Sequence, residues 1–141
     1  VLFLCTGNSC RSQMAEGWCR ALLGGTLEAY SAGIEARGLD PRAVRAMAEA
    51  GIDISGQRSK TIEEVMSVPF DWVVTVCSHA AENCPVFPGR VRVLRMEFDD
   101  PPALARGVAS EEEAMAPYRR VRDEIRAFIV SLPGNLNKSL A

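Results

Sequence analysis

Short apolar runs alternate with amphipathic stretches along the chain. Residues 1–4, VLFL, are apolar without alternation, which is typical of a strand buried on both faces of a sheet. Three further segments have the composition of strands: residues 27–32, 71–76 and 91–96. The pattern therefore predicts four strands, of which residues 71–76, DWVVTV, give the clearest signal.

Apolar residues at helical spacing separate the first strands. One helix is predicted from Ser12 to the glycine pair at 24–25, with its apolar residues on one face. A second helix has Asp40 as its N-cap and Pro41 in its first turn, and it is predicted to end at Gly51.

Two more helices are predicted in the second half of the chain. One is short, over residues 61–66, and the other is long and amphipathic, over residues 111–132. Pro133 and Gly134 are expected to end the long helix, because proline cannot continue a helical hydrogen-bond pattern. The tail to Ala141 is expected to be loose.

Strands that alternate with helices are typical of an α/β fold. We expect a four-stranded parallel sheet flanked by helices on both faces. The 141 residues fit one domain, residues 1–141, with one core. Ligands bind such sheets at the carboxyl ends of the strands. Cys5 and Cys77 each end a predicted strand, so we expect them to share one rim of the sheet.

Composition and charge exclude several classes of protein. Apolar residues make up 48% of the chain and the net charge is -2, as in ordinary soluble domains. The basic excess of a nucleic-acid binder is missing, and no apolar run approaches the roughly 18 residues that span a membrane. The five cysteines are an odd number, which argues against a secreted disulfide framework. We therefore expect a cytoplasmic monomer whose cysteines serve chemistry or packing.

The first strand runs into the loop CTGNSCRS, which precedes the first helix. Backbone N–H groups of such a loop point inward and form an anion site. Gly7 permits a tight turn, Asn8 tolerates a left-handed conformation, and Arg11 offers a planar fork to two oxygens of an oxyanion. The predicted oxyanion-binding residues are Thr6, Gly7, Asn8, Ser9, Cys10, Arg11 and Ser12. A Walker-type loop is excluded because the Gly-Lys-Ser/Thr sequence is missing.

Cys5 would lie at the floor of this loop. A helix N-terminus and a nearby cation stabilise the thiolate, which is the nucleophilic form, and the Ser12 hydroxyl is placed to donate to it. The alternative is a packed cysteine beside a surface arginine, which leaves the flanking strand, glycine and helix unexplained. Cys10 is either an accessory thiol or a small loop residue, and Cys19 is expected in the core.

A second pair of cysteines occurs in CSHAAENC, residues 77–84. The middle of this segment favours helix, and seven helical residues rise about 10.5 Å. A disulfide needs Cα atoms roughly 4.4–6.8 Å apart. Cys77 and Cys84 can therefore bond only if the segment unwinds, which is the behaviour of a redox switch. The alternatives are two buried cysteines or half a zinc site. A zinc site is a weak alternative because His79 is the only histidine, its spacing to Cys77 is tight, and no CxxC motif occurs. His79 is expected in a surface loop.

An acidic pair, Asp99 and Asp100, follows the last predicted strand and precedes Pro101. An aspartate beside an anion site can act as general acid and protonate a departing oxygen. Pro101 stiffens the backbone at Asp100, which is the candidate acid. The alternative is a turn with two solvated aspartates.

With these motifs together, the chain resembles the thioredoxin-coupled arsenate reductases, which have the fold of the low-molecular-weight protein tyrosine phosphatases. The resemblance runs from VLFLCTGNSCRSQMAEGW through YSAGIEARGLDPRAV and VVTVCSHAAENCP to FDDP. Cys5, Arg11 and Ser12 are spaced as in the whole superfamily. The pair Cys77 and Cys84 separates the reductases from the phosphatases, because phosphoester hydrolysis needs no further thiol.

The resemblance implies a function and a role for each site residue. Cys5 would attack arsenate, the loop from Thr6 to Arg11 would bind the oxyanion, and Asp100 would be the general acid. Cys77 would release arsenite and form a disulfide with Cys5. Cys84 would then form a disulfide with Cys77 and free Cys5. Thioredoxin would reduce the outward Cys77–Cys84 disulfide, so the implied role is arsenic detoxification. Arsenate is the implied substrate, with phosphate or sulfate as competing anions, and no tightly bound cofactor or metal is expected.

One position departs from the pattern of the family. Some members bind potassium through an asparagine, a glutamate, a serine and an aspartate. Asn8, Glu16 and Ser31 match the first three, and Lys60 stands at the fourth. Our hypothesis is that the Lys60 ammonium takes the place of the cation.

Two other functions stay open at the level of sequence. A phosphatase for tyrosine or small phosphoesters would use the same loop and the same acid. Family phosphatases usually have aromatic residues after the Asp-Pro pair, whereas this chain has Pro102, Ala103 and Leu104. A sensor whose thiols report arsenite or oxidation would bind oxyanions without turnover.

Overall fold

The computed structural model describes residues 1–140, without the side chains of residues 135 and 137–140. Its four strands pair in the order β2-β1-β3-β4, and every pairing is parallel. This confirms the predicted four-stranded parallel sheet. In chain order the elements are β1 (Leu2–Cys5), α1 (Arg11–Leu23), β2 (Tyr30–Gly33), α2 (Pro41–Glu49), the 3-10 helix η1 (Ile62–Val65), β3 (Trp72–Thr75), α3 (Ser78–Glu82), β4 (Arg92–Arg95), α4 (Pro101–Ala105) and α5 (Glu111–Leu140).

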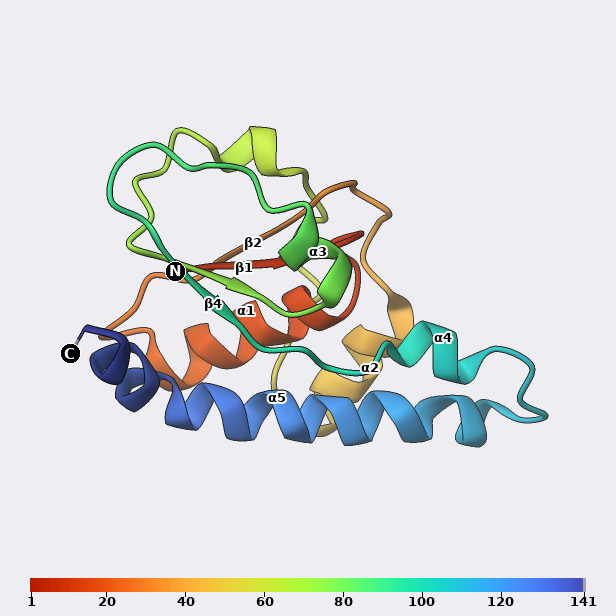
Figure 1. Cartoon of the computed structure of the whole chain (residues 1–141). Helices are drawn as coiled ribbons and strands as arrows, with labels where there is room; N and C mark the ends of the chain where they lie inside the picture. The colour runs from red at the N-terminus through yellow and green to blue at the C-terminus, as the bar shows by residue number, and fades with distance from the viewer. Residues whose placement is uncertain (141) are drawn as a thin grey trace.

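Helices cover both faces of the sheet, as predicted, but unequally. On one face α1 packs against β1 and β2, and the long helix α5 lies across α1 and α2 (Figure 1). On the other face the short helix α3 packs against β1 and β3, and η1 lies beside β2. The last strand in the sheet, β4, is an exposed edge strand, with Val93 53% exposed.

The centre of the sheet is β1, whose four residues are all buried. Its neighbour on one side is β2, with Cys5 opposite Gly33, and on the other side β3, with Leu4 opposite Thr75. The strand order therefore reverses at β1. In open α/β sheets the crevice at the carboxyl ends of the strands, next to such a reversal, is where ligands bind. The topology places the Cys5 loop at that point.

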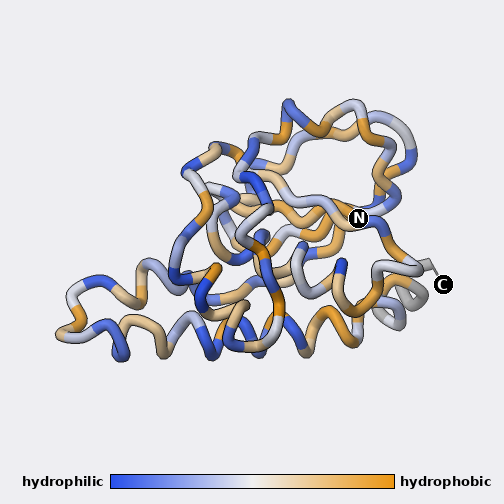
Figure 2. The backbone as a smooth tube through the Cα atoms, turned by 180° about the vertical axis from the view of Figure 1, so that it is seen from behind, coloured by the Kyte–Doolittle hydropathy of each residue, from blue (hydrophilic) through white to orange (hydrophobic). Residues whose placement is uncertain are grey.

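The long helix α5 corrects the prediction that Pro133 and Gly134 end it. The helix continues to Leu140, although the missing N–H of Pro133 removes one hydrogen bond of the ladder. Leu132 and Leu136 are both buried and extend the apolar face of the helix past the proline, which offsets the lost bond. Polar and apolar residues alternate along α5 (Figure 2), and its last turns run in a different direction from the rest (Figure 1). The prediction of a loose tail was therefore also wrong for residues 135–140, which are helical, and Ala141 lies outside the described residues.

Other boundaries differ by a few residues. The predicted strand 27–32 starts later in the structure, at Tyr30, and 91–96 is shortened by one residue at each end. The predicted helix 61–66 is a 3-10 helix with Thr61 as its N-cap. The sequence did not predict α4. Within residues 1–140, the helices are all too short or too polar to cross a membrane.

Candidate active site

The loop between β1 and α1 is shaped by Asn8. This residue has a left-handed backbone (φ 48°), as its type allows, and its side chain is fully buried. Gln13 and the backbone N–H of Lys60 both donate to Asn8 Oδ1, at 2.9 Å. Asn8 Nδ2 in turn donates to Ser12 Oγ at 2.8 Å. The amide is thus held on three sides, so it fixes the path of the loop.

The same network orients Ser12 toward Cys5. Ser12 Oγ lies 2.8 Å from Cys5 Sγ. The serine oxygen also accepts from Asn8 Nδ2, so one hydroxyl links the buried amide of the loop to the Cys5 sulfur. Cys5 ends β1 and lies at the start of the turn into α1, whose first residue is Arg11. The buried Cys5 sulfur is therefore hydrogen-bonded to Ser12 within the loop that leads into the N-terminus of α1.

Arg11 and Asp100 meet over this loop. Arg11 Nη1 donates to the Phe98 carbonyl at 3.1 Å, and Arg11 Nη2 lies 3.5 Å from Asp100 Oδ1. Asp100 is the N-cap of α4, and Pro101 opens that helix. The Asp100 side chain is 40% exposed, so it can exchange a proton with solvent between reactions. The two candidates that lie far apart in the sequence are therefore brought together.

These side chains surround a cavity of about 150 Å³. Its lining residues are Cys5, Thr6, Gly7, Ser9, Cys10, Arg11, Arg37, Asp100, Pro102 and Arg106. Pockets for drug-sized ligands are usually about 300–1,000 Å³, so this cavity suits a small ion. Of the predicted oxyanion-binding residues, Asn8 and Ser12 lie behind the cavity wall and the other five line it. Arg37 and Arg106 were not predicted from the sequence.

The thiol of Cys77 lies against the same loop. Cys77 Sγ is 3.3 Å from Thr6 Oγ1, the residue next to Cys5. Cys77 is also the N-cap of α3, and the backbone N–H of Ala80 donates to its sulfur at 3.4 Å. The expectation that Cys5 and Cys77 share one rim of the sheet is met through this contact with Thr6.

Cys84 lies apart from the other two thiols. Helix α3 separates it from Cys77, as the sequence predicted, and its Sγ contacts the Pro85 carbonyl at 3.7 Å. The thiol is half-buried, and burial raises its pKa above the usual value. All five cysteines are free in this structure. A bond between Cys77 and Cys84 thus requires α3 to rearrange.

The match to a known family covers the whole chain. The model described as low molecular weight phosphotyrosine protein phosphatase matches residues 1–141. The chain belongs to this family. The predicted phosphatase-like fold is confirmed, since solved structures of the same family superpose on nearly the whole chain.

Several relatives that resemble the chain are named arsenate reductases. The arsenate reductase of Bacillus subtilis strain 168 is 54% identical over 125 residues, which are 89% of this chain and 88% of that protein. The solved structure of an arsenate reductase in the phosphate-binding state has a TM-score of 0.74 at 31% identity and covers 95% of each chain. The thioredoxin-dependent arsenate reductase of Corynebacterium glutamicum has a TM-score of 0.70 at 26% identity, with 98% of this chain and 61% of that chain covered.

The buried carboxylate of Glu16 lies in α1, which follows the loop between β1 and α1. Glu16 accepts from Ser31 Oγ at 2.7 Å, and Lys60 Nζ lies 3.7 Å from its Oε1. Arg20 pairs with the other carboxylate oxygen at 2.9 Å. The structure thus brings Glu16, Ser31 and Lys60 together. Asn8 joins them only through the backbone N–H of Lys60.

The remaining predicted residues have clear positions. Cys19 is fully buried in the core, and burial raises its pKa to about 11. Cys10 lines the cavity and is buried, and burial raises its pKa well above the usual value, so it is a neutral thiol near pH 7. His79 is exposed, as predicted, but it lies in α3 and not in a loop. Its Nδ1 is 3.1 Å from Thr6 Oγ1, a contact that depends on the folding of α3 and has no local signal.

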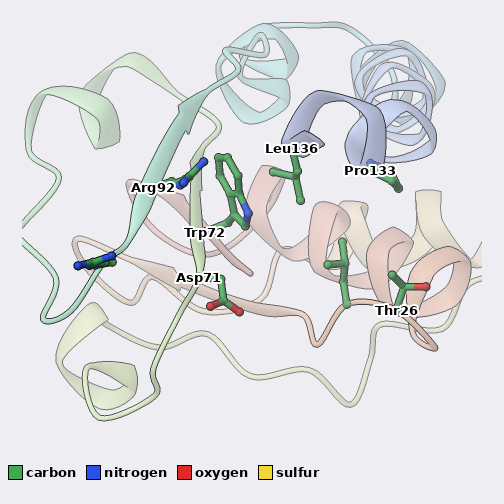
Figure 3. Close-up of a pocket in the computed structure, with 8 residues that line it drawn as sticks. Thr26, Asp71, Trp72, Arg92, Pro133 and Leu136 are labelled. Carbon is green, nitrogen blue, oxygen red and sulfur yellow. The ribbon is translucent and has the colours of Figure 1, made fainter. Parts of the chain in front are cut away.

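A larger cavity lies at the other end of the strands, near the amino ends of β3 and β4 (Figure 3). It has a volume of about 470 Å³ and is lined by Trp72, Asp71 and Arg92 at the start of β3 and β4, and by Leu136 of α5. It contains none of the candidate site residues. Among the described residues, no group of three or more histidine, cysteine or acidic side chains is arranged to hold a metal ion.

Proposed function

We propose that this chain reduces arsenate to arsenite through a relay of three thiols, Cys5, Cys77 and Cys84, and that thioredoxin recycles it. The observation that carries the proposal is the 3.3 Å contact between Cys77 Sγ and Thr6 Oγ1. A second thiol in contact with the loop after β1 supports the relay, because phosphoester hydrolysis does not need such a thiol. The arsenate reductases among its relatives support the same activity.

In the first step Cys5 attacks arsenate. The Cys5 thiolate forms a sulfur–arsenic bond, and one arsenic–oxygen bond breaks. Asp100 gives its proton to the departing hydroxyl group of arsenate, which leaves as water. Arg11 and the backbone N–H groups of the loop balance the negative charge that stays on the other oxygens. Arsenic remains in the +5 state through this step.

In the second step Cys77 attacks Cys5. A sulfur–sulfur bond forms, the sulfur–arsenic bond breaks, and its electron pair goes to arsenic, which leaves as arsenite. Two thiols are oxidised to one disulfide while arsenic gains two electrons, so the electrons balance. Thr6 supports this step because its hydroxyl contacts Cys77 Sγ. The backbone N–H of Ala80 donates to Cys77 Sγ and helps to hold the attacking sulfur in place.

In the third step Cys84 attacks Cys77 and frees the Cys5 thiolate. The resulting Cys77–Cys84 disulfide cannot form across an intact α3, because the helix holds its two ends too far apart. Helix α3 has only five residues, so its unwinding breaks few hydrogen bonds. Two electrons from the thioredoxin dithiol then restore both thiols. The Corynebacterium relative, which is thioredoxin-dependent, supports this choice of reductant.

The test compares turnover of the wild type with that of Cys84→Ser and the matched control Cys19→Ala. Arsenite formation is followed as NADPH oxidation with thioredoxin and thioredoxin reductase. We expect many turnovers for the wild type and the control, and at most one for Cys84→Ser. Equal turnover of all three would show that Cys84 has no part in electron transfer. Cleavage of an aryl phosphate without any arsenite formation would identify a phosphatase, and oxyanion binding without either activity would identify a sensor.

A further inference from the structure

Two arginines that the proposed chemistry does not use line the mouth of the cavity. Arg37 comes from the segment after β2, and Arg106 directly follows α4. Both stand with Arg11 and Asp100 around an opening that leads to Cys5. Pro102 lines the same cavity between Asp100 and Arg106 in the sequence.

Arg37 is fixed in position by the loop itself. Its backbone N–H donates to the Gly7 carbonyl at 2.9 Å, and its aliphatic stem covers Gly7 so closely that an added Cβ there would lie 2.7 Å from Arg37 Cδ. Its guanidinium donates to Glu35 Oε2 at 2.9 Å. Arg37 therefore shares its charge with a carboxylate.

Arg106 is placed by the same short helix that carries Asp100. That residue caps α4 at its start and Arg106 caps it at its end, where its backbone N–H donates to the Ala103 carbonyl. Helix α4 packs on α5, which holds both residues at the mouth. Within the part of the chain that the structure describes, the Arg106 guanidinium makes no ion pair.

The charges at the mouth nearly cancel. The three guanidiniums of Arg11, Arg37 and Arg106 face two carboxylates, Glu35 and Asp100. In the state that starts the proposed reaction, Asp100 carries its proton and Cys5 is a thiolate, so three guanidiniums stand against two negative charges, those of Glu35 and Cys5. The unpaired charge of Arg106 then decides whether the opening attracts or repels an incoming dianion.

We propose that Arg106 and Arg37 form an outer anion subsite that captures a free tetrahedral oxyanion and passes it to Arg11. The inference rests on the proposed function and narrows its substrate class. A free oxyanion presents charged oxygens to both arginines at once. A phosphate ester presents an apolar group there, to which two guanidiniums offer little. The subsite thus favours inorganic oxyanions over aryl esters.

The test measures the charge at the mouth without turnover. Cys5 of the reduced protein is alkylated with iodoacetate, an anion, and with the neutral iodoacetamide, and the modified peptide is quantified by mass spectrometry. We expect Arg106→Gln to lower the iodoacetate-to-iodoacetamide rate ratio at Cys5 roughly threefold to tenfold, and Arg106→Lys to retain most of it. Arg90→Gln is the matched control, because it removes one exposed arginine at the other end of the strands.

The subsite proposal would be wrong if the iodoacetate-to-iodoacetamide rate ratio were unchanged in Arg106→Gln. It would also be wrong if the ratio fell equally in Arg90→Gln. Steady-state kinetics adds a second readout: in Arg106→Gln, kcat/KM for arsenate should fall more than kcat does. If the wild type makes no arsenite, the proposed function fails. The alkylation ratio still decides whether the subsite exists, so the two failures can be told apart.

Discussion

At the scale of single residues, Lys60 is one of two cations beside the buried Glu16 carboxylate, and Arg20 pairs with the other oxygen. The Lys60 ammonium lies 3.7 Å from Glu16 Oε1 and donates to the Arg58 carbonyl at 3.0 Å. Burial lowers the pKa of Lys60, while the Glu16 charge opposes this shift. An ammonium in this position excludes a potassium ion beside Glu16, because two cations at contact distance would repel each other.

We therefore predict that potassium does not stimulate the enzyme. Arsenite formation should be the same in potassium chloride as in choline chloride of equal ionic strength. Lys60→Asp removes the ammonium and supplies a carboxylate, so this variant should gain a potassium-specific increase. A clear rise of the wild type with potassium would show that the ammonium does not take the place of the cation.

A second residue-scale prediction concerns Gly33, which pairs with Cys5 across β2 and β1. A Cβ at Gly33 would lie 2.2 Å from the Glu35 carbonyl oxygen and 2.7 Å from the Asn8 backbone nitrogen. Both are backbone atoms that cannot swing aside. Gly33→Ala should lower the free energy of unfolding by about 1–3 kcal/mol, measured by urea denaturation. Gly25→Ala meets nothing within 4 Å and is the control, and equal stability of the two variants would contradict the argument.

At the scale of elements, ion pairs join α2 to α5. Glu49 of α2 accepts two hydrogen bonds from Arg119 of α5, at 2.8 and 3.0 Å, and lies 3.6 Å from Arg122. The Arg119 hydrogen bonds, followed by the charges of the neighbouring arginines, hold the pKa of Glu49 below its usual 4.5. A depressed carboxyl pKa stabilises the folded state above the unfolded pKa, and this contribution is lost as the pH falls through the folded pKa.

We predict that the melting temperature of Glu49→Gln depends less on acid pH than that of the wild type. Between pH 7 and pH 3, the melting temperature of the wild type should drop more than that of this variant. Glu63→Gln, which removes an exposed carboxylate of η1, is the control and should keep the wild-type slope. Because the Glu49 pair is exposed and screened by solvent, the difference should be modest and should shrink in high salt. Parallel curves of melting temperature against pH for all three proteins would show that the Glu49–Arg119 pair does not stabilise the folded state.

The elements also show what a sequence can reveal. β1, α1, α2 and β3 have local signals, such as a continuous apolar run or an Asp-Pro start, and their predicted bounds were within about two residues. The end of α5 was wrong because the burial of Leu136 outweighs the local effect of Pro133. The helix α4 was missed because its five residues have no apolar period to detect.

Some residues of the candidate site could likewise be predicted from local sequence signals, and others could not. Cys5, Arg11 and the loop between them follow from one contiguous motif. Cys77 and Asp100 follow from the rule that parallel strands end at one rim. Arg37 and Arg106 have no such signal, because their part in the cavity depends on how the segment after β2 and the end of α4 return to the loop. Tertiary structure alone places them there.

At the scale of the whole molecule, oxyanion binding should stabilise the fold. The loop, α4 and the segment after β2 form the cavity only when folded, so an anion bound there favours the folded state. Phosphate at 100 times its dissociation constant adds about 2.7 kcal/mol of stability. For a chain of this size that is a rise in melting temperature of about 8 °C.

Phosphate also stabilises proteins without a site, since it is excluded from protein surfaces. The comparison therefore needs Arg11→Gln, which removes the planar fork from the cavity and leaves the rest of the surface unchanged. We expect the phosphate-dependent rise in melting temperature to be large in the wild type and small in this variant, with a saturating dose response only in the wild type. A linear and equal rise in both would mean that phosphate acts on the surface. The cavity beside Cys5 would then not be the oxyanion site, and the first step of the proposed reaction would lose its basis.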